Sequence, residues 1–590
     1  MFLTLHPSEI DLVMNKWVNR LFVKGGFIII FLLFFTCSKE VEPKADLIIK
    51  NGKIITVDSS FSIATALAIR EGKFIGVGSD DEMKKYAGAQ TKQIDVQGKT
   101  VIPGLIDGHT HPESASISEL VDEIPDLHSI RELMDWIKLE TTQKEEGEWI
   151  IHPKMFHTRL KELRLPSLEE LDLIAPNHPV FLNGAYGGLI NSAAMKASGI
   201  TNNTVHEGLI RNNKNGKFEG VIRRSAFDLL KIPSNDFNER EKDEALVALL
   251  HRYNQYGITG IISGSGDLSY YQRYRRLSRK NELTVRVSQN MMLPFDMGDS
   301  PDRLIDSLKR MREITGPGDE WVRPGSIKIV LDGGILTGTA YLRAPWGKDA
   351  FEVYNIKDPE YRGVLRYSAD ELFNIVSAVD KSGWAFTAHC TGGGGVDMLL
   401  DAFEQLNLKT SVEEKRFSII HGNFFTREAI SRMQQLGILA NIQPAWFYKD
   451  AKAMKYVLGD ERIKTFNPYR SMVEGEVILC GGSDHMVKVD ANTSINPYNP
   501  FLSMWSMITR KTEGGTIITA NEQISREQAL RTYTINNAYA SFDESSRGSI
   551  EVGKWADLAV LSDDLLTCPV DQIKEIRSEL TLLGGEVVFD

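Results

Sequence analysis

VIPGLIDGHTHPE, residues 101–113, is apolar as far as Asp107 and then changes abruptly to a glycine, two histidines and a carboxylate. In an extended strand alternate side chains point to the same side, so His109 and His111 lie on one face. Two neutral imidazoles on one face are suited to bind a divalent cation such as zinc, nickel or iron. The segment therefore predicts a buried strand that ends in metal ligands.

Similar apolar runs recur along the middle of the chain and alternate with helical patterns such as DEALVALLHRYNQYG and DELFNIVSAVDKSG. Strands that alternate with helices favour a parallel sheet, and eight of them favour an α/β fold of the (β/α)8 TIM barrel type. We assign this barrel to residues 103–544. Its eight runs, in chain order, are VIPGLID, ITGIIS, TVRVSQ, SIKIVL, WAFTAH, RFSIIH, ILANIQ and VILCGGS.

Two further structural parts are predicted around the barrel. ADLIIKNGKIITVD joins two apolar runs through an Asn-Gly pair, the strongest short hairpin signal, and the C-terminal GSIEVGKWADLAVLS and ELTLLGGEVVFD have the same character. We expect residues 46–102 and 545–590 to form one small β-sandwich domain from both chain ends. Residues 113–256 are too long for one strand-to-helix connection and contain runs such as HPVFLNGAY, so we expect them to contain an inserted lid subdomain.

The first 37 residues have the pattern of a secretory signal. Basic MNKWVNRLFVKGG is followed by FIIIFLLFFT, which is too short for a helix that crosses a hydrocarbon core of roughly 30 Å. The cysteine that follows resembles a bacterial lipoprotein signal, which would make Cys37 the lipidated first residue, with 38–45 as a tether. We expect an exported, membrane-attached protein at the periplasmic or cell surface. An uncleaved anchor and an incorrectly assigned start remain alternatives.

The composition excludes some functions. The chain has 590 residues with 42% hydrophobic side chains, enough for a large core, and a net charge of −11. It contains no Lys/Arg-rich run, so we expect no nucleic-acid partner. Cys390, Cys480 and Cys568 are widely spaced and give neither a disulfide framework nor a C-x-x-C metal site.

Further metal-competent residues stand at or near the ends of other predicted barrel strands. They are Lys328 in the fourth, His389 in the fifth, His421 in the sixth and Asp484 after the eighth. A barrel brings the carboxyl ends of its strands to one opening, so we expect these groups to meet His109 and His111 there. The alternative is that the histidines are ordinary hydrogen-bonded residues.

Lys328 stands between Ile327 and Ile329, where burial of an ammonium is costly unless it is neutralised or paired. Asp332 is the alternative ion-pair partner. The glycine-rich TGGGGVD, residues 391–397, is interpreted as a tight turn after His389. Trp346, Trp384 and Trp446 are expected either to line an apolar pocket or to pack in the core.

From residue 45 to residue 590 the chain resembles the amidohydrolase superfamily and, within it, the amidohydrolase 3 group with its N-substituted formamide deformylase-like enzymes. The motifs that carry the resemblance are PGLIDGHTH, LINSAAMKASGIT, IKIVLDGGILTGTAYL, WAFTAHCTGGGGVDMLLDAFE, RFSIIHGN, GILANIQPAW, GGSD and GKWADLAVLSDD. The resemblance implies that His109 and His111 bind the more buried of two ions and that His389 and His421 bind the other. It also implies that carboxylated Lys328 bridges both ions, and that Asp484 contacts metal and handles the proton.

These observations together predict a metal-dependent hydrolase of a C–N bond in a non-peptide amide, formamide or cyclic amide. A metal-activated hydroxide would attack, with Asp484 as general base and then general acid. We expect two zinc ions, with nickel, iron or manganese as alternatives, and a small amide-type substrate; homo-oligomerisation is left open.

The substrate pocket has three candidate residues. Members of the amidohydrolase 3 group often have Gly-His at the position of Ala185-Tyr186 in this chain, and tryptophan at the position of His485. Strand alternation would turn His485 away from the metal, and Asp332 is the third candidate. Two other functions are kept open: a one-metal heterocycle deaminase with unmodified Lys328, and a non-catalytic surface-binding lipoprotein.

Overall fold

The computed structural model describes residues 43–184, 187–211, 216–234, 236–293 and 300–590. Cys37 with the rest of the predicted signal, and Tyr186, lie outside the described residues. Residues 44–590 form one structural unit, and no helix in its described part is long and apolar enough to cross a membrane.

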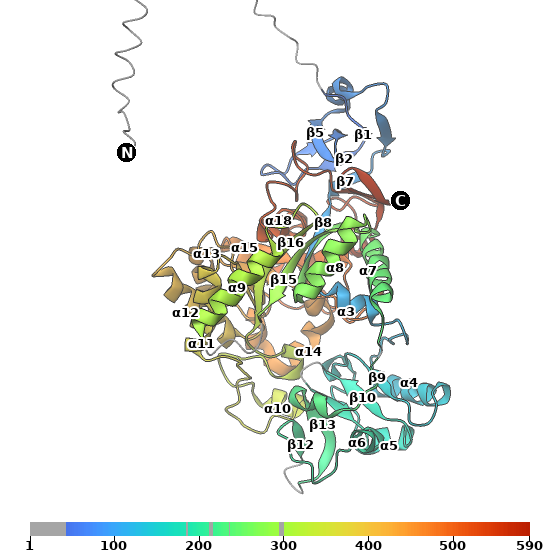
Figure 1. Cartoon of the computed structure of the whole chain (residues 1–590), viewed down its shortest axis with the longest axis vertical. Coiled ribbons are helices and arrows are strands. Elements are labelled where there is room, and N and C mark those ends of the chain that lie inside the picture. The colour runs from blue at the N-terminus through green and yellow to red at the C-terminus, as the bar shows by residue number, and fades with distance from the viewer. Residues whose placement is uncertain (1–42, 185–186, 212–215, 235, 294–299) are drawn as a thin grey trace, which may run out of the picture. The chain divides into compact units, whose positions relative to one another are not determined.

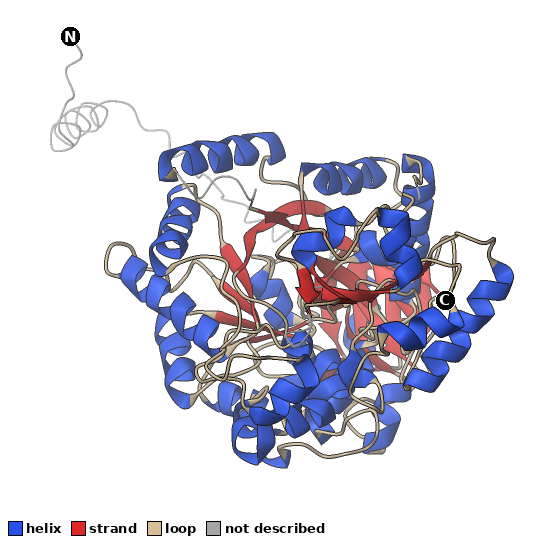
Figure 2. Ribbon diagram, turned by 90° about the horizontal axis from the view of Figure 1, so that it is seen from below, coloured by secondary structure: helices blue, strands red, loops and turns tan. Residues whose placement is uncertain are grey.

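Eight parallel strands form the central sheet, and helices surround it (Figures 1 and 2). All eight apolar runs contribute one strand each, which confirms the predicted α/β barrel. In sheet order the strands are β8 (Leu105–Thr110), β14 (Ile258–Gly266), β15 (Arg286–Met292), β16 (Val322–Val330), β17 (Phe386–Cys390), β18 (Ser418–His421), β19 (Leu439–Ile442) and β20 (Leu479–Gly481). The larger surrounding helices are α7 (Glu239–Asn254), α8 (Leu268–Arg279), α9 (Pro301–Thr315), α11 (Ala369–Lys381), α12 (Gly393–Asn407), α13 (Arg427–Leu436) and α16 (Pro500–Thr509).

Within the described residues no ladder forms between β8 and β20, the first and last strands of the sheet. Other hydrogen bonds join these two strands instead. The Asn537 amide on α18 (Ile535–Ala540) donates to the carbonyls of Ile106 and Gly481, at 2.5 and 2.7 Å. Gly108 leaves room for this closure, since a Cβ there would lie 2.8 Å from the Gly481 carbonyl oxygen. The glycine of the GHTH motif therefore allows the two strand ends to approach each other.

The chain between β8 and α7 folds as a separate subdomain with its own five-stranded sheet (Figure 1). The sheet order is β12 (Leu209–Arg211), β13 (Phe218–Arg223), β11 (Gly187–Ile190), β10 (Val180–Asn183) and β9 (Ile150–His152), with helices α4 (Ile130–Gln143), α5 (Leu168–Ile174) and α6 (Ser192–Ser198). It contacts the barrel through Arg159, whose Nε and Nη2 donate to both oxygens of Asp450 on α14 (Pro444–Arg462), at 2.7 and 2.8 Å.

Strands from both chain ends form two further sheets, seen in blue and red in Figure 1. One contains β5 (Lys73–Gly78), β4 (Ala66–Arg70), β1 (Leu47–Lys50) and β6 (Lys92–Asp95). The other contains β23 (Glu586–Phe589), β22 (Ser578–Leu583), β21 (Leu558–Leu561), β7 (Thr100–Pro103), β2 (Lys53–Ile55) and β3 (Ile63–Ala64). The first run of the sequence is thus divided at Gly104, since β7 belongs to this sheet and β8 to the barrel.

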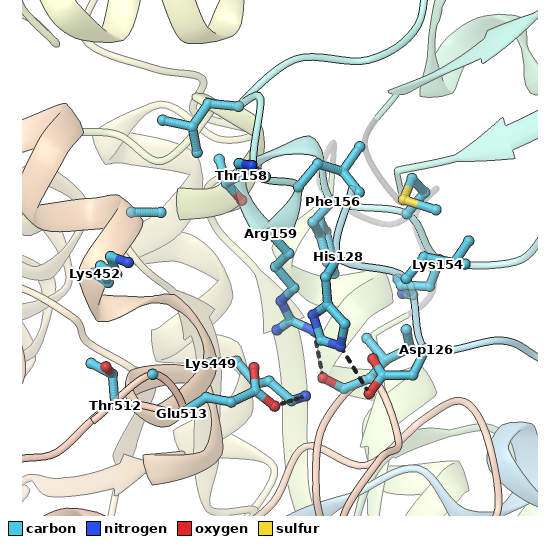
Figure 3. A pocket seen from close by; sticks show the side chains of 18 of the residues that line it. Asp126, His128, Lys154, Phe156, Thr158, Arg159, Lys449, Lys452, Thr512 and Glu513 are labelled. Atoms are coloured by element: carbon cyan, nitrogen blue, oxygen red, sulfur yellow. Dashed lines mark hydrogen bonds and ion pairs between the residues drawn. The ribbon is translucent and has the colours of Figure 1, made fainter. Parts of the chain in front are cut away.

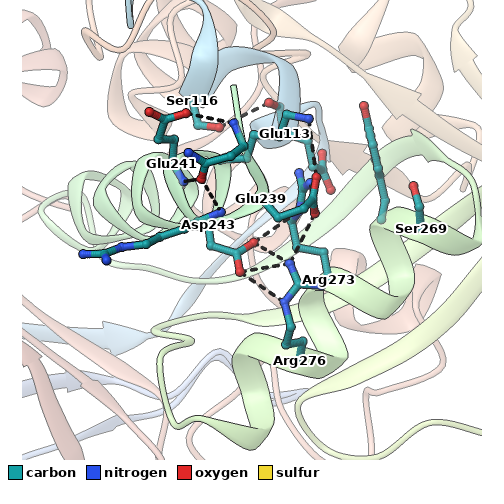
Figure 4. A network of polar contacts seen from close by, with 12 residues as sticks. Glu113, Ser116, Glu239, Glu241, Asp243, Ser269, Arg273 and Arg276 are labelled. Carbon is teal, nitrogen blue, oxygen red and sulfur yellow. Dashed lines mark hydrogen bonds and ion pairs between the residues drawn. The ribbon is translucent and has the colours of Figure 1, made fainter. Parts of the chain in front are cut away.

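Helix α7, which returns the chain to the barrel, is held to α8 by a network of ion pairs (Figure 4). Asp243 of α7 accepts from Arg276 at 2.7 Å, and Arg273 Nε lies 3.3 Å from the same carboxylate. Arg273 also pairs with Glu239 at 2.8 Å. Glu113 of α3 (Pro112–Ile117) lies beside this network, buried and accepting from Ser263 Oγ at 3.2 Å.

The glycine-rich segment after His389 forms a helix start, so the predicted tight turn is wrong. Strand β17 ends at Cys390, Gly392 is the N-cap, and the following glycines form the first turn of α12. Glycine is required because this turn packs on backbone: a Cβ on Gly392 would lie 2.1 Å from the Tyr341 carbonyl oxygen.

Candidate metal centre

His109, His111 and Asp484 form the centre of the candidate site. The Nε2 atoms of the two histidines lie 3.4 and 3.2 Å from Asp484 Oδ1, and the ligand atoms of all three residues lie within 4.8 Å of one another. Asp484 has a φ of +56°, a conformation that costs energy for a non-glycine residue and often marks functional positions. Its N–H donates to the His109 carbonyl at 2.6 Å, which fixes the carboxylate against the end of β8.

His389 and His421 extend the cluster across the barrel opening. Their ring centroids are 4.4 Å apart, and His421 lies 5.9 Å from the His109 ring. The Gln443 amide oxygen lies 2.7 Å from His421 Nδ1. Because an amide oxygen only accepts, Nδ1 carries the proton and Nε2 of His421 keeps a lone pair for a cation. His421 also has a positive φ, of +75°.

Lys328 lies among these histidines, 3% exposed on β16. In the β16–β17 register Lys328 pairs with Thr387, two residues before His389, and after burial its charge contributes to the lowered pKa values of His109, His389 and His421. Burial lowers the pKa of Lys328 itself to about 7, opposed by the charge of Asp484. The structure thus brings the six predicted ligands to one end of the barrel.

Asp332 does not pair with Lys328 as the alternative interpretation required. Its carboxylate accepts N–H bonds from Thr391, Gly392 and Tyr341 at 2.9, 2.8 and 3.0 Å, and the residue is 1% exposed. Three backbone donors satisfy the oxygens, so Asp332 fixes the start of α12, and its Oδ1 lies 3.9 Å from His389 Nε2.

The protonation states of the cluster fit a divalent cation. Burial, with the charge of Lys328, lowers the pKa of His109 to about 3, and burial likewise lowers that of His389 to about 3 and that of His421 well below its ordinary value. Burial alone would raise the pKa of Asp484, but hydrogen bonds from His109 and His111 bring it well below its usual range. Neutral imidazoles beside an ionised carboxylate are the donor set that zinc and similar metals bind.

Trp446 donates a hydrogen bond to the cluster, a contact that the sequence did not predict. Its indole Nε1 donates to Asp484 Oδ2 at 2.9 Å, so the oxygen not facing His109 and His111 is fixed. Trp346 and Trp384 are core residues, and their indoles donate to the carbonyls of Ala340 and Leu308. Only Trp446 of the three therefore touches the site.

Asp107 and Ser483 hold the two ligand-bearing segments together. Asp107 Oδ1 accepts the N–H groups of His109 and Ser483, at 3.1 and 3.0 Å, and Oδ2 accepts the Ser483 hydroxyl at 2.6 Å. Burial raises the pKa of Asp107 to about 6 despite these bonds. The apolar run that opens at Val101 is thus followed by Asp107, whose carboxylate positions the segment of His109 and the segment of Ser483.

His485 lies on the opposite side of the chain from Asp484. It is fully buried, its Nδ1 lies 2.8 Å from the Tyr253 hydroxyl, and its Nε2 contacts the Lys488 carbonyl. Alternation predicted that it would turn away from the metal, and both ring nitrogens are engaged there. His485 is therefore held by partners on both ring nitrogens behind Asp484.

Lys154 of the inserted subdomain was not anticipated from the sequence. Burial lowers the pKa of its ammonium to about 8, and the charge of Asp484 partly opposes this shift. No motif surrounds Lys154, so the sequence does not reveal that it lines a cavity between the inserted subdomain and the barrel.

Comparison with known proteins places this geometry in context. Residues 92–589 match the amidohydrolase family. N-substituted formamide deformylase of Arthrobacter pascens is 29% identical over 562 residues, which cover 92% of this chain and 98% of that protein. Protein LONG AFTER FAR-RED 3 of Arabidopsis thaliana is 29% identical, with 94% of each chain covered. The crystal structure of an uncharacterized metal-dependent hydrolase from Pyrococcus furiosus superposes with a TM-score of 0.64 at 21% identity, covering 88% of this chain and 100% of that one.

Proposed function

This chain belongs to the amidohydrolase family, and we propose that it hydrolyses a C–N bond, other than a peptide bond, in a small amide, formamide or cyclic amide. The observation that carries the proposal is the convergence of His109, His111 and Asp484 within 4.8 Å at the barrel opening. The similarity to a formamide deformylase over nearly the whole of both chains supports the choice of bond.

We propose two divalent cations, zinc by default, as the resident metals. His109 and His111 would hold one and His389 and His421 the other, with Asp484 in contact. When bound, such cations act as Lewis acids and lower the pKa of coordinated water toward neutrality. Lys328 would bridge them as a carbamate, and its pKa of about 7 supports this, because only the neutral amine adds to carbon dioxide.

Asp484 is the proposed proton carrier. It is ionised, and Oδ1 faces His109 and His111 while Oδ2 is occupied by the Trp446 indole. Oδ1 would take the proton of the attacking water and return it to the leaving nitrogen. A fixed carboxylate suits this task because the same oxygen must face water first and the nitrogen afterwards.

Amine release from a panel of N-substituted formamides and cyclic amides tests the proposal, with metal-loaded protein of residues 38–590. We expect turnover in the wild type and a loss of at least about 1,000-fold in Asp484→Asn, whose amide cannot accept the proton. Turnover of purines or other heterocycles instead, with ammonia release, would favour the deaminase alternative. Wild-type protein that binds metal and hydrolyses no C–N bond would refute the proposal.

We also propose export and lipid attachment at Cys37. The basic and apolar segments that precede it support this. Cys37→Ser should release the protein from the membrane fraction of a bacterial host, and an unchanged membrane fraction with no acyl label on the wild type would contradict the assignment.

A further inference from the structure

A cavity of about 470 Å³ lies between the inserted subdomain and the barrel (Figure 3). Its walls come from residues 125–163 of the insertion and from barrel segments near 449–456, 494–495 and 512–514. The charged lining is predominantly basic: four lysines and Arg159 face only two carboxylates, Asp126 and Glu513. A cavity of this volume accommodates a small organic molecule, and its charge favours an anionic one.

Two of the five cations that line the cavity have carboxylate partners. Arg159 forms the bidentate pair with Asp450, and Lys449 pairs with Glu513. Lys154, Lys161 and Lys452 have no carboxylate at ion-pair distance within the described residues, and of these three only Lys154 is half-buried, whereas the other two are exposed. A half-buried ammonium without a carboxylate partner favours an anionic ligand.

The wall that carries Lys154 also borders the metal centre. Phe156, two residues along, has its ring 5.7 Å from that of Trp446, whose indole donates to Asp484. Lys154, Phe156 and Arg159 all line the cavity, and the Arg159 guanidinium lies 5.2 Å from the centre of the same Trp446 ring. A substrate with its C–N bond at the metal ligands would therefore extend past Trp446 toward the wall that carries Lys154.

We propose that Lys154 binds a carboxylate of the substrate, so that the preferred substrates are amides with a carboxylate close to the scissile bond, such as N-formyl amino acids. This inference rests on the proposed C–N hydrolase function. It separates this chain from an enzyme for neutral formamides, because the carboxylate contact comes from the inserted subdomain and not from the metal ligands.

Kinetics with a matched substrate pair form the first test. N-formylphenylalanine and N-formylphenethylamine differ only in the carboxylate. We expect Lys154→Met to lower kcat/KM for the anionic substrate about 30-fold and to change that for the neutral one less than about twofold. Lys154→Arg should restore part of the difference, and Lys357→Met, which removes an exposed lysine outside the cavity lining, is the matched control without effect.

Binding forms the second test and needs no turnover. Calorimetry on the metal-loaded protein would compare the non-hydrolysable N-methanesulfonylphenylalanine with N-methanesulfonylphenethylamine. We expect the wild type to bind the anionic compound at least about 10-fold more tightly and Lys154→Met to lose this preference. Equal affinities in the wild type, or a preference that survives Lys154→Met, would overturn the inference even if amides are hydrolysed. A Lys154-dependent preference without any amide hydrolysis would refute the proposed function and support the anion site.

Discussion

Replacement of Trp446 by phenylalanine isolates one hydrogen bond to the proposed proton carrier. The indole Nε1 donates to Asp484 Oδ2 at 2.9 Å, and phenylalanine retains an aromatic ring against Phe156 while removing the donor. A hydrogen bond to a charged group contributes roughly 1.5–3 kcal/mol. If that contribution orients the carboxylate for proton transfer, kcat should fall about 10- to 100-fold.

The assay is steady-state amine release, with metal content and thermal unfolding measured on the same samples. Trp384→Phe is the matched control, because its indole donates to the Leu308 carbonyl in the core at 3.0 Å, away from the metal ligands. It should lower stability by about 1 kcal/mol and leave kcat unchanged. A folded, metal-replete Trp446→Phe enzyme with kcat within about twofold of the wild type would refute the orienting role.

Two further predictions concern metal affinity and stability. Gln443→Met removes the acceptor that fixes the ring of His421, so metal affinity should fall about 10- to 100-fold in chelator competition. Replacement of the exposed Gln435 by methionine is the control and should have no effect. Equal metal affinities of Gln443→Met and the wild type would contradict the assignment. Asp557→Asn breaks an ion pair with Arg286 in which both side chains are 4% exposed. We expect the free energy of unfolding, measured by thermal unfolding, to fall by about 3–5 kcal/mol. A fall below about 1 kcal/mol would show that the ion pair is not needed for stability.

The barrel and the positions of the candidate ligands were predictable because both depend on local patterns. Each apolar run ends within three residues of the end of a parallel strand, and the barrel fold alone then brings His389, His421 and Asp484 toward His109. The partners of Asp332 were not predictable, because the sequence does not show that three backbone N–H groups would satisfy its carboxylate.

The supporting residues were not predictable, because their roles depend on contacts between distant segments. Trp446 and Gln443 belong to a motif with no spacing that signals a hydrogen bond to Asp484 or His421. Lys154 lines a cavity against the barrel, on which its subdomain docks through Arg159 and Asp450. The glycines after Cys390 favour a turn by local propensity, and their packing against Tyr341 explains why they start a helix.

Metal content per chain tests the central claim most directly. Residues 38–590 would be expressed with and without added bicarbonate, as wild type and Lys328→Met, and analysed for elements. The account predicts about two divalent ions per wild-type chain with bicarbonate and a clear loss in Lys328→Met, because the bridging carbamate is then absent. One ion per chain that is insensitive to Lys328, or no tightly bound ion after supplementation, would contradict the dinuclear hydrolase.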